Sequence, residues 1–381
     1  MGRPTLQRTM SSVFAPVAVV SFSSAQVDAC EQFLSARVAD TECIPIVDER
    51  QLLMGADGRV LENGYRFNAI GFSAVCGALI GGLSSVFNEL CGESRNRYAE
   101  SITNGDLAAA VAIYNTALRA RFELLQERTL LVNHADKTID GFLGIEHRML
   151  DNFVFFNLIT DELRTQQPDS AFYRAEISGR ELRLYFVHNG TKRNDLYFDA
   201  KHTFAAGWFF SNREDAGLAI RAAQAVLTKF GAAVPTRKKS STLRHVGADL
   251  LGRTVELIQK AARDTVSSEQ LARGVSRLQS MSLNFAESKN AFDAAFEHWL
   301  AYLTRFKIPL DVAKNVCRTA AFSGADLQSQ SAVDIYSKQS ASARTMYDLF
   351  CALLKISRTQ YASVKDVMQN AAFEMLFLDE K

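Results

Sequence analysis

The chain has 381 residues, of which 48% are hydrophobic and 22% are charged, and its formal net charge is +1. This length and composition predict a globular protein with two structural units, and they exclude a disordered or collagen-like chain. Because the net charge is close to zero, any affinity for nucleic acid must come from a local cluster of cations.

The first part of the chain predicts alternating strands and helices. A strand is expected at Val17–Phe22 and a helix near Ala25–Val38. Strands and turns are expected from Glu42 to Tyr65, where Asp-Gly and Asn-Gly pairs are typical of hairpin turns. Two helices follow, at Phe72–Leu90 and Asn104–Glu127, because their apolar residues recur at helical spacing.

The pattern then changes to short strands. A tight turn at Ser178-Gly179 separates two of these strands, and Leu218–Phe230 returns to helical spacing. The expected strands are Thr129–Val132, Phe172–Ile177, Glu181–Val187 and Asp195–Asp199.

From about Ala248 every segment is expected to be helical, with Ser, Thr or Asp caps at several starts. The sequence therefore predicts an α+β core at residues 1–265, in which a curved antiparallel sheet packs on helices. An all-helical C-terminal domain is expected at residues 266–381. The expected helices are 248–264, 267–305, 310–320, 329–355 and 361–378.

Two further features bear on location. The six cysteines are widely spaced, and no pair has metal-ligand spacing, which predicts reduced thiols in a cytoplasm and no zinc site. Residues 67–87 hold no charged side chain, but four glycines and several polar residues favour a buried helix over a membrane span. No secretion signal is apparent at the start of the chain, so we expect no membrane association.

The densest cationic segment runs from Pro235 to Gly247. It also holds four hydroxyl side chains and no carboxylate. Guanidinium, ammonium, hydroxyl and backbone N–H groups are those that bind phosphate oxygens. A solvated loop without a ligand is the alternative, although the position between two well-patterned segments favours a function. The candidate phosphate-binding residues are Arg237, Lys238, Lys239, Arg244 and His245.

A second group of cations alternates with aromatic residues along the predicted strands. A sheet with exposed rings and a cationic rim can bind single-stranded nucleic acid, because bases stack on the rings while cations hold the phosphates. Alternatively, the rings form the buried face of the sheet. The candidate residues are Arg183, Lys192, Arg193, Tyr185 and Tyr197.

No common signature of nucleotide binding or hydrolysis occurs in the chain, and the sequence predicts no cofactor. Three carboxylates, of Glu146, Asp151 and Glu214, would suit a Mg²⁺-dependent nuclease if they converged. Salt bridges with neighbouring arginines are the more ordinary interpretation. Whether a reaction is catalysed stays open.

The middle of the chain resembles one family in three motif segments and in the charged-to-apolar hairpin at residues 172–187, which lies where that family has its strand pair. Ile139–Asn152 looks like its FLSxRYRxLDN segment, Gly207–Glu214 is similar to its GxxxxNSE strand and turn, and Leu243–Gly247 resembles its RHVG motif. The family is the phage- and plasmid-type domain of unknown function 932. The similarity covers about residues 45–265.

The departures from the family pattern fall mainly in the first segment, where Gly144, Glu146 and His147 replace its Ser, Arg and Tyr. Arg244 and His245 match directly. The resemblance implies a phage or plasmid protein, in the cytoplasm of a bacterial host cell, linked to DNA replication or recombination. It implies no established reaction.

Together these features predict a nucleic-acid-binding protein, with single-stranded DNA binding or annealing as the specific hypothesis. We expect a homo-oligomer that assembles through the helical part. A Mg²⁺-dependent nuclease and a non-catalytic phage interaction or structural protein are the alternatives.

Overall fold

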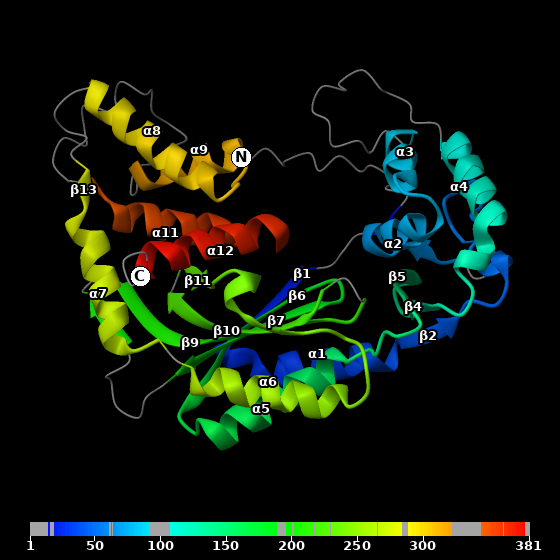
Figure 1. Ribbon diagram of the computed structural model, residues 1–381, viewed down its shortest axis with the longest axis horizontal. Coiled ribbons are helices and arrows are strands. Elements are labelled where there is room, and N and C mark those ends of the chain that lie inside the picture. The colour runs from blue at the N-terminus through cyan, green and yellow to red at the C-terminus, as the bar shows by residue number, and fades with distance from the viewer. Residues whose placement is uncertain are drawn as a thin grey trace, which may run out of the picture.

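The computed structural model is organised around a curved antiparallel sheet with helices on both faces (Figure 1). A smaller sheet with its own helices lies at one end, and helices make up the C-terminal part. The predicted α+β fold with a curved sheet and C-terminal helices is therefore confirmed. The structure describes residues 14–15, 19–60, 62, 64–90, 107–188, 196–199, 202–215, 218–228, 230–264, 266–283, 289–321, 344–360 and 362–377.

The large sheet has eight strands in the order β1-β6-β7-β9-β10-β11, with β8 paired to β9 and β12 paired to β10. All of these pairs are antiparallel. The strands are β1 (Val19–Ser23), β6 (Ser170–Ser178), β7 (Glu181–His188), β8 (Leu196–Asp199), β9 (His202–Arg213), β10 (Ile220–Thr228), β11 (Gly231–Ala233) and β12 (Ser241–Leu243).

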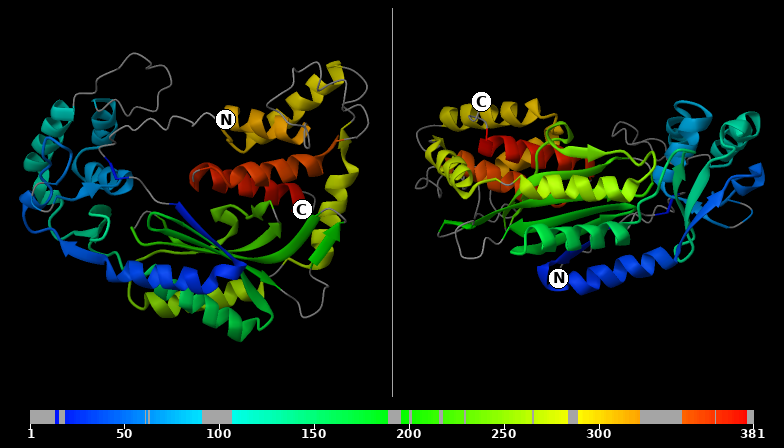
Figure 2. Two further views of the ribbon diagram at one scale, coloured as in Figure 1. Left: turned by 180° about the vertical axis from the view of Figure 1, so that it is seen from behind. Right: turned by 60° about the horizontal axis from the view of Figure 1, so that its bottom comes forward.

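Helices α1 (Val27–Ala39), α5 (Asn152–Gln166) and α6 (Leu250–Arg263) cover one face of the large sheet, as both views of Figure 2 show. Because strand side chains alternate between faces, every second residue points towards these helices. Leu184 and Phe186 of β7 pack in this core, together with Trp208 of β9. The Trp208 side chain donates a hydrogen bond from Nε1 to the Ala261 carbonyl oxygen of α6.

The C-terminal helices cover the opposite face. Helices α11 (Met346–Ser357) and α12 (Ala362–Phe377) lie next to the sheet, and the remaining C-terminal helices pack around them. On this face Arg183 and Tyr185 of β7 contact Asp366 and Gln369 of α12, and near the end of the sheet Phe204 and Val226 share one hydrophobic core with the C-terminal helices. The predicted domain boundary near residue 265 falls between α6 and α7, but the parts on either side pack against each other. The other elements here are α7 (Ser268–Ser280), β13 (Ser282–Leu283), α8 (Lys289–Arg305), α9 (Leu310–Ala321) and β14 (Arg344–Thr345).

The small unit has a separate core. Its sheet has the order β2-β4-β5-β3, in which only β3 and β5 are parallel. Phe72 and Phe87 lie at its centre with ring centroids 4.5 Å apart, and Tyr114 packs beside them. Its elements are β2 (Thr41–Pro45), β3 (Arg66–Phe67), α2 (Ala69–Leu79), α3 (Leu83–Leu90), α4 (Leu107–Arg121), β4 (Thr129–Asn133) and β5 (Thr138–Leu143).

The predicted helix at Leu218–Phe230 is wrong, because this segment forms strand β10. Nearly all of its residues are buried, since helices cover both faces of the sheet at this point. Ile220 packs towards α5 and α6, whereas Ala223 and Leu227 face the other side. Burial on both faces removes the polar alternation by which a strand is recognised, and the many alanines resemble a helical segment.

Two predicted helices are each divided in the structure. The segment 72–90 forms α2 and α3, because Gly81-Gly82 interrupts it and Gly82 has a φ of +84°, which favours glycine. The segment 267–305 forms α7 and α8 with β13 between them. Within the predicted helix 329–355, the described part begins with β14 and becomes helical at Met346, and the earlier residues lie outside the described part.

Among the described residues, no helix combines the length and apolar character that crossing a membrane requires.

Gly207 lies where two strands approach too closely for a side chain. A Cβ atom at this position would clash with the Phe186 carbonyl oxygen and lie 3.1 Å from Leu227 Cδ1. We therefore expect Gly207→Ala to lower the free energy of unfolding by about 1–3 kcal/mol or more, measured by urea denaturation. Gly77→Ala is the control, because Gly77 is exposed in α2 with open space around it. It should raise stability by up to about 1 kcal/mol. Equal stabilities of the two variants would contradict this packing.

Candidate functional site

The three segments that resemble family motifs meet in space. His147 forms an isolated antiparallel bridge with Val246, and the Arg148 amide donates to the His245 carbonyl oxygen over 2.7 Å. The Asn212 side chain donates to the Leu150 carbonyl oxygen over 2.7 Å. We call this region, built from residues 139–152, 207–215 and 243–247, the motif junction.

A buried arginine connects the two sheets at the motif junction. Arg180, in the turn between β6 and β7, has a side chain that is only 1% exposed. Its Nε donates to Asp140 Oδ2 of β5 over 2.7 Å, and its Nη1 donates to Glu214 Oε2 over 3.2 Å. The same Nη1 donates to Thr41 Oγ1 of β2 over 2.7 Å. One guanidinium therefore binds β2, β5 and the end of β9.

The carboxylates around Arg180 receive further hydrogen bonds. Asp140 accepts from Asn68 over 3.1 Å and from Thr138 over 2.7 Å, and Glu214 accepts from the Asn152 amide over 2.7 Å. Burial raises the pKa of Glu214, although Arg180 and the Asn152 amide oppose the shift. These groups form a satisfied buried network, so they act in the structure and present no free charge to a ligand.

Two stacked imidazoles form the other part of the motif junction. The rings of His147 and His245 lie 5.1 Å apart at an interplanar angle of 26°. His245 Nδ1 lies 3.2 Å from the Arg148 carbonyl oxygen, and His147 Nε2 lies 3.3 Å from that of Glu214. Since carbonyl oxygens only accept, these nitrogens carry the protons of the neutral rings. Burial and His147 lower the pKa of His245 to about 4, and burial also lowers that of His147.

The predicted basic segment runs along the edge of the large sheet. Residues Arg237–Lys239 form a short 3₁₀ helix between β11 and β12, and Arg244 follows β12. Lys238, Lys239 and Arg244 are exposed, and Arg237 is half-buried. Lys239 forms an ion pair with Glu374 of α12. Of the predicted phosphate ligands here, His245 is buried and neutral, so it is not available on the surface.

The predicted aromatic and cationic face is not exposed where the structure describes it. Arg183 is buried and pairs with Glu181 at 2.8 Å and with Asp366 of α12 at 2.9 Å. Tyr185 is 1% exposed, and its hydroxyl accepts from the Gln369 side chain over 3.2 Å. Assigning these two residues to a nucleic-acid surface was wrong, because α12 covers this face.

The other three candidate residues of this predicted face are Lys192, Arg193 and Tyr197. Lys192 and Arg193 lie outside the described residues. Tyr197 lies in β8 opposite Phe204 of β9, and only its backbone is described.

The three carboxylates of the nuclease hypothesis have separate roles. Asp151 caps α5, where its side chain accepts from the amides of Phe153 and Val154. Glu214 pairs with buried Arg180, whereas Glu146 is exposed. In the described part of the chain, no three His, Cys, Asp or Glu side chains are grouped so that they could hold a metal ion.

Sequence reasoning overlooked Arg180 and Asp140 as partners. Both were visible as charged residues beside apolar strands, but their pairing joins positions 40 residues apart in the chain. Nothing in either local segment identifies the partner, which only the fold brings close.

Comparisons with models of protein families, with curated proteins and with solved structures found no match to this chain. The resemblance to the domain of unknown function 932 family therefore stays a prediction, and the site must be interpreted from its own geometry.

Protonation of His245 should destabilise the folded chain as the pH falls. The pKa of this residue is about 4 in the folded state, against an ordinary value of 6.5 in the unfolded chain. Between these values the unfolded state binds a proton that the folded state does not. The stability that neutral His245 provides is therefore complete above pH 6.5 and is lost as the pH falls to about 4.

His245→Gln removes this titration and keeps a hydrogen-bonding side chain. Between about pH 7 and 4, the free energy of unfolding of the wild type should fall by on the order of 3 kcal/mol more than that of the variant. Urea denaturation at fixed pH values measures both. If the free energies of unfolding of wild type and variant change with pH in the same way, the pKa of His245 is not lowered by burial.

Proposed function

We propose that this chain binds nucleic acid, and that it holds the phosphate backbone along the sheet edge formed by residues 237–244. The observation that supports the proposal is the set of unpaired cations at this edge. Among the described residues, no carboxylate lies within ion-pair distance of Arg237, Lys238 or Arg244. Guanidinium and ammonium groups without protein partners are the groups that phosphates bind.

The spacing of these cations suits an extended backbone. An extended chain covers at most about 3.3–3.6 Å per residue, so Lys238 and Arg244 lie within about 20 Å of each other. A separation of up to this length spans at most several phosphates of one strand, whose rise is about 3.4 Å per nucleotide in a duplex. Hydroxyl groups of Ser241 and Thr242 in β12 lie between the two cations in sequence.

Because helices cover both faces of the sheet, its edge is where we propose the contact. Helices α5 and α6 occupy one face, and α11 and α12 occupy the other. The rings of Tyr185 and Phe209 are buried and cannot stack on bases. Binding through phosphates alone predicts little sequence preference and a strong dependence on salt. The resemblance adds DNA replication or recombination as the setting of this proposal.

Removing the three unpaired cations should weaken binding to every sequence alike. The variant Arg237→Ala/Lys238→Ala/Arg244→Ala should bind single-stranded and duplex oligonucleotides more weakly, with a salt slope reduced by up to about one unit per lost contact. Fluorescence anisotropy across a salt series measures both quantities. The matched control is Arg119→Ala/Lys314→Ala/Lys355→Ala, which removes the same charge from exposed positions on α4, α9 and α11. If the two triple variants bind equally well, the edge is only a solvated surface.

Single substitutions at this edge should differ in how much they lower the affinity for oligonucleotides, because only some of the cationic side chains form ion pairs. Lys239 is neutralised by Glu374, whereas Arg244 has no carboxylate partner among the described residues. Arg244→Ala should therefore reduce oligonucleotide affinity more than Lys239→Ala does, with little change in thermal stability for either variant. An Arg244 contact with Glu214 is not formed, since Glu214 pairs with Arg180. Equal, negligible losses of affinity would remove Arg244 from the proposal.

The annealing version of the proposal also requires self-association, which stays a prediction. The C-terminal helices share a core with the sheet, so truncation would expose Phe204 and Val226 of that core. The intact chain is therefore the proper sample. Mass photometry with and without single-stranded DNA should detect oligomers, and a monomer under both conditions would exclude a ring or filament.

A further inference from the structure

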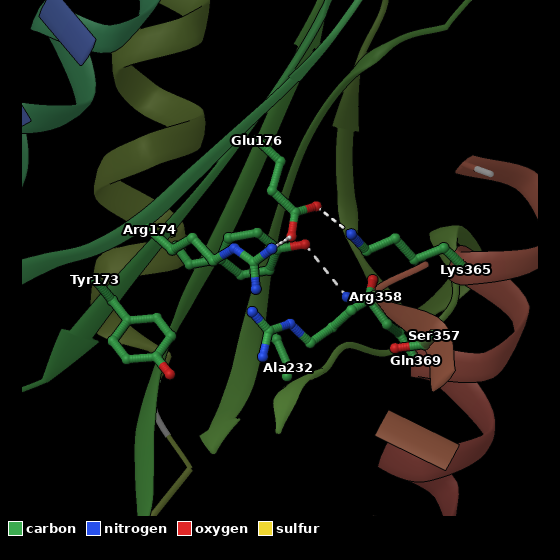
Figure 3. A pocket seen from close by; sticks show the side chains of 10 residues that line it. Tyr173, Arg174, Glu176, Ala232, Ser357, Arg358, Lys365 and Gln369 are labelled. Atoms are coloured by element: carbon green, nitrogen blue, oxygen red, sulfur yellow. Dashed lines mark hydrogen bonds and ion pairs between the residues drawn. The ribbon is translucent and has the colours of Figure 1, made fainter. Parts of the chain in front are cut away.

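A second concentration of positive charge lies between the sheet and the C-terminal helices. Here β1 and its following turn, β6, the end of β10 and the corner between α11 and α12 line an open cavity of about 270 Å³. An adjoining pocket extends beneath α12 (Figure 3). The polar lining of the first, 270 Å³ cavity includes Ser21, Ser23, Gln26, Tyr173, Arg174 and Arg358.

Two guanidinium groups from distant parts of the chain share this cavity. Arg174 extends from β6 and Arg358 from the corner after α11, and their side chains point towards one another beside the Tyr173 ring (Figure 3). Two guanidiniums that line one pocket repel each other, and an anion bound between them would remove this repulsion. Arg358 is exposed, and within the described ranges no carboxylate lies at ion-pair distance from it.

A buried ion pair holds Arg174 in place. Its Nη2 lies 2.9 Å from Glu176 Oε1, and the other oxygen of Glu176 pairs with Lys365 of α12. Burial raises the pKa of Glu176, but Lys365 and Arg174 outweigh it and lower the pKa overall, so the carboxylate is charged. A guanidinium has five N–H donors, so Arg174 keeps donors for the cavity after binding Glu176.

The charges of the two pockets do not cancel. Arg174, Arg358 and Lys365 supply three cations, and Glu176 supplies one carboxylate, which leaves an excess of two positive charges. The Ser21 and Ser24 hydroxyls and the side-chain NH₂ group of Gln26 add uncharged donors, while Ser23 Oγ donates to Gln26 Oε1 over 3.0 Å. The Tyr173 hydroxyl donates to the Thr228 carbonyl oxygen over 2.9 Å, which fixes the ring as one wall.

We propose that this cavity binds a phosphate dianion, either free or carried by a small phosphomonoester. Two guanidiniums that line one pocket can donate to different oxygens of a tetrahedral dianion, and the excess charge of two matches its charge. The cavity volume is near the lower end of small-molecule sites, which fits a ligand of a few heavy atoms beyond the phosphate. This site lies on elements other than the basic sheet edge, and it does not depend on the proposed nucleic-acid binding.

A bound anion would connect β6 to the corner of α11 and α12. Because Arg358 would then interact with the sheet through the ligand, binding should stabilise the folded chain by mass action. Thermal unfolding provides a readout that requires no assumption about an activity.

The test uses the full chain and defined probes. Isothermal titration and thermal unfolding should detect inorganic phosphate and glycerol 3-phosphate, and glycerol and chloride at matched ionic strength should have no effect. Tighter binding of glycerol 3-phosphate would identify a phosphomonoester site, and tighter binding of inorganic phosphate would identify a free-phosphate site. If neither phosphate probe binds the wild type, the proposal is overturned.

Arg358→Gln is the decisive variant, because its exposed side chain can change without disturbing the core. It should weaken phosphate binding at least about tenfold, since it removes charge-assisted hydrogen bonds to the anion. Lys355→Gln is the control, because it removes one exposed charge of the same helix outside the cavity. Equal phosphate affinities of the two variants would contradict the site.

The two binding proposals fail independently. Arg358→Gln should leave the binding of oligonucleotides with 5′-hydroxyl ends unchanged, because these lack a terminal phosphate. The triple variant at residues 237, 238 and 244 should keep wild-type affinity for glycerol 3-phosphate. If Arg358→Gln lost oligonucleotide binding as well, the cavity would belong to the nucleic-acid surface and would not be a separate small-anion site.

Discussion

The junction of the two sheets depends on the buried guanidinium of Arg180. A charged group that is 1% exposed is tolerable only if its donors meet acceptors of good geometry. Asp140 comes from the small sheet and Glu214 from the large one, so neither unit alone can satisfy Arg180. The relative position of the two sheets is therefore coupled to this network. Removing one partner would leave a buried charge unpaired, which typically costs about 3–5 kcal/mol.

A second layer of charges sets how the C-terminal helices lie on the large sheet. Arg183 pairs with Asp366, and Glu176 pairs with Lys365, so consecutive residues of α12 bind two different strands. Apolar contacts alone would allow the helix to slide along the sheet, whereas these pairs are satisfied in one position only. This layer also explains why the strands carry charges on a buried face. Because both faces are occupied, the positive charge left for ligands lies at the sheet edge and at the corner after α11.

The sequence was sufficient to predict strands that are marked by a turn and by alternating charged and apolar residues. The hairpin of β6 and β7 was predicted from its turn and its strand patterns, and the structure confirms it. Strand β10 was missed because its residues are mainly alanine and other apolar types, whereas β7, which is equally buried, begins with alternating charged and apolar residues. Helix α5 was not predicted, although Asp151 caps it and its apolar residues have helical spacing. In the candidate site, exposed Arg244 could be identified locally, but the burial of Arg183 is decided by α12, which lies far away in the sequence.

The three segments of the resemblance have two different physical roles. Asp140, Asn152 and Glu214 form hydrogen bonds within the buried network. These residue types are therefore needed to hold the two sheets together. His245 is stacked on His147 and is also buried. Arg244 is the exception, since its side chain is exposed and no partner among the described residues requires a cation there. A charge that the fold does not need is better explained by a ligand than by stability. The proposed nucleic-acid contact is therefore centred on the edge that contains Arg244, while the buried junction holds that edge in position.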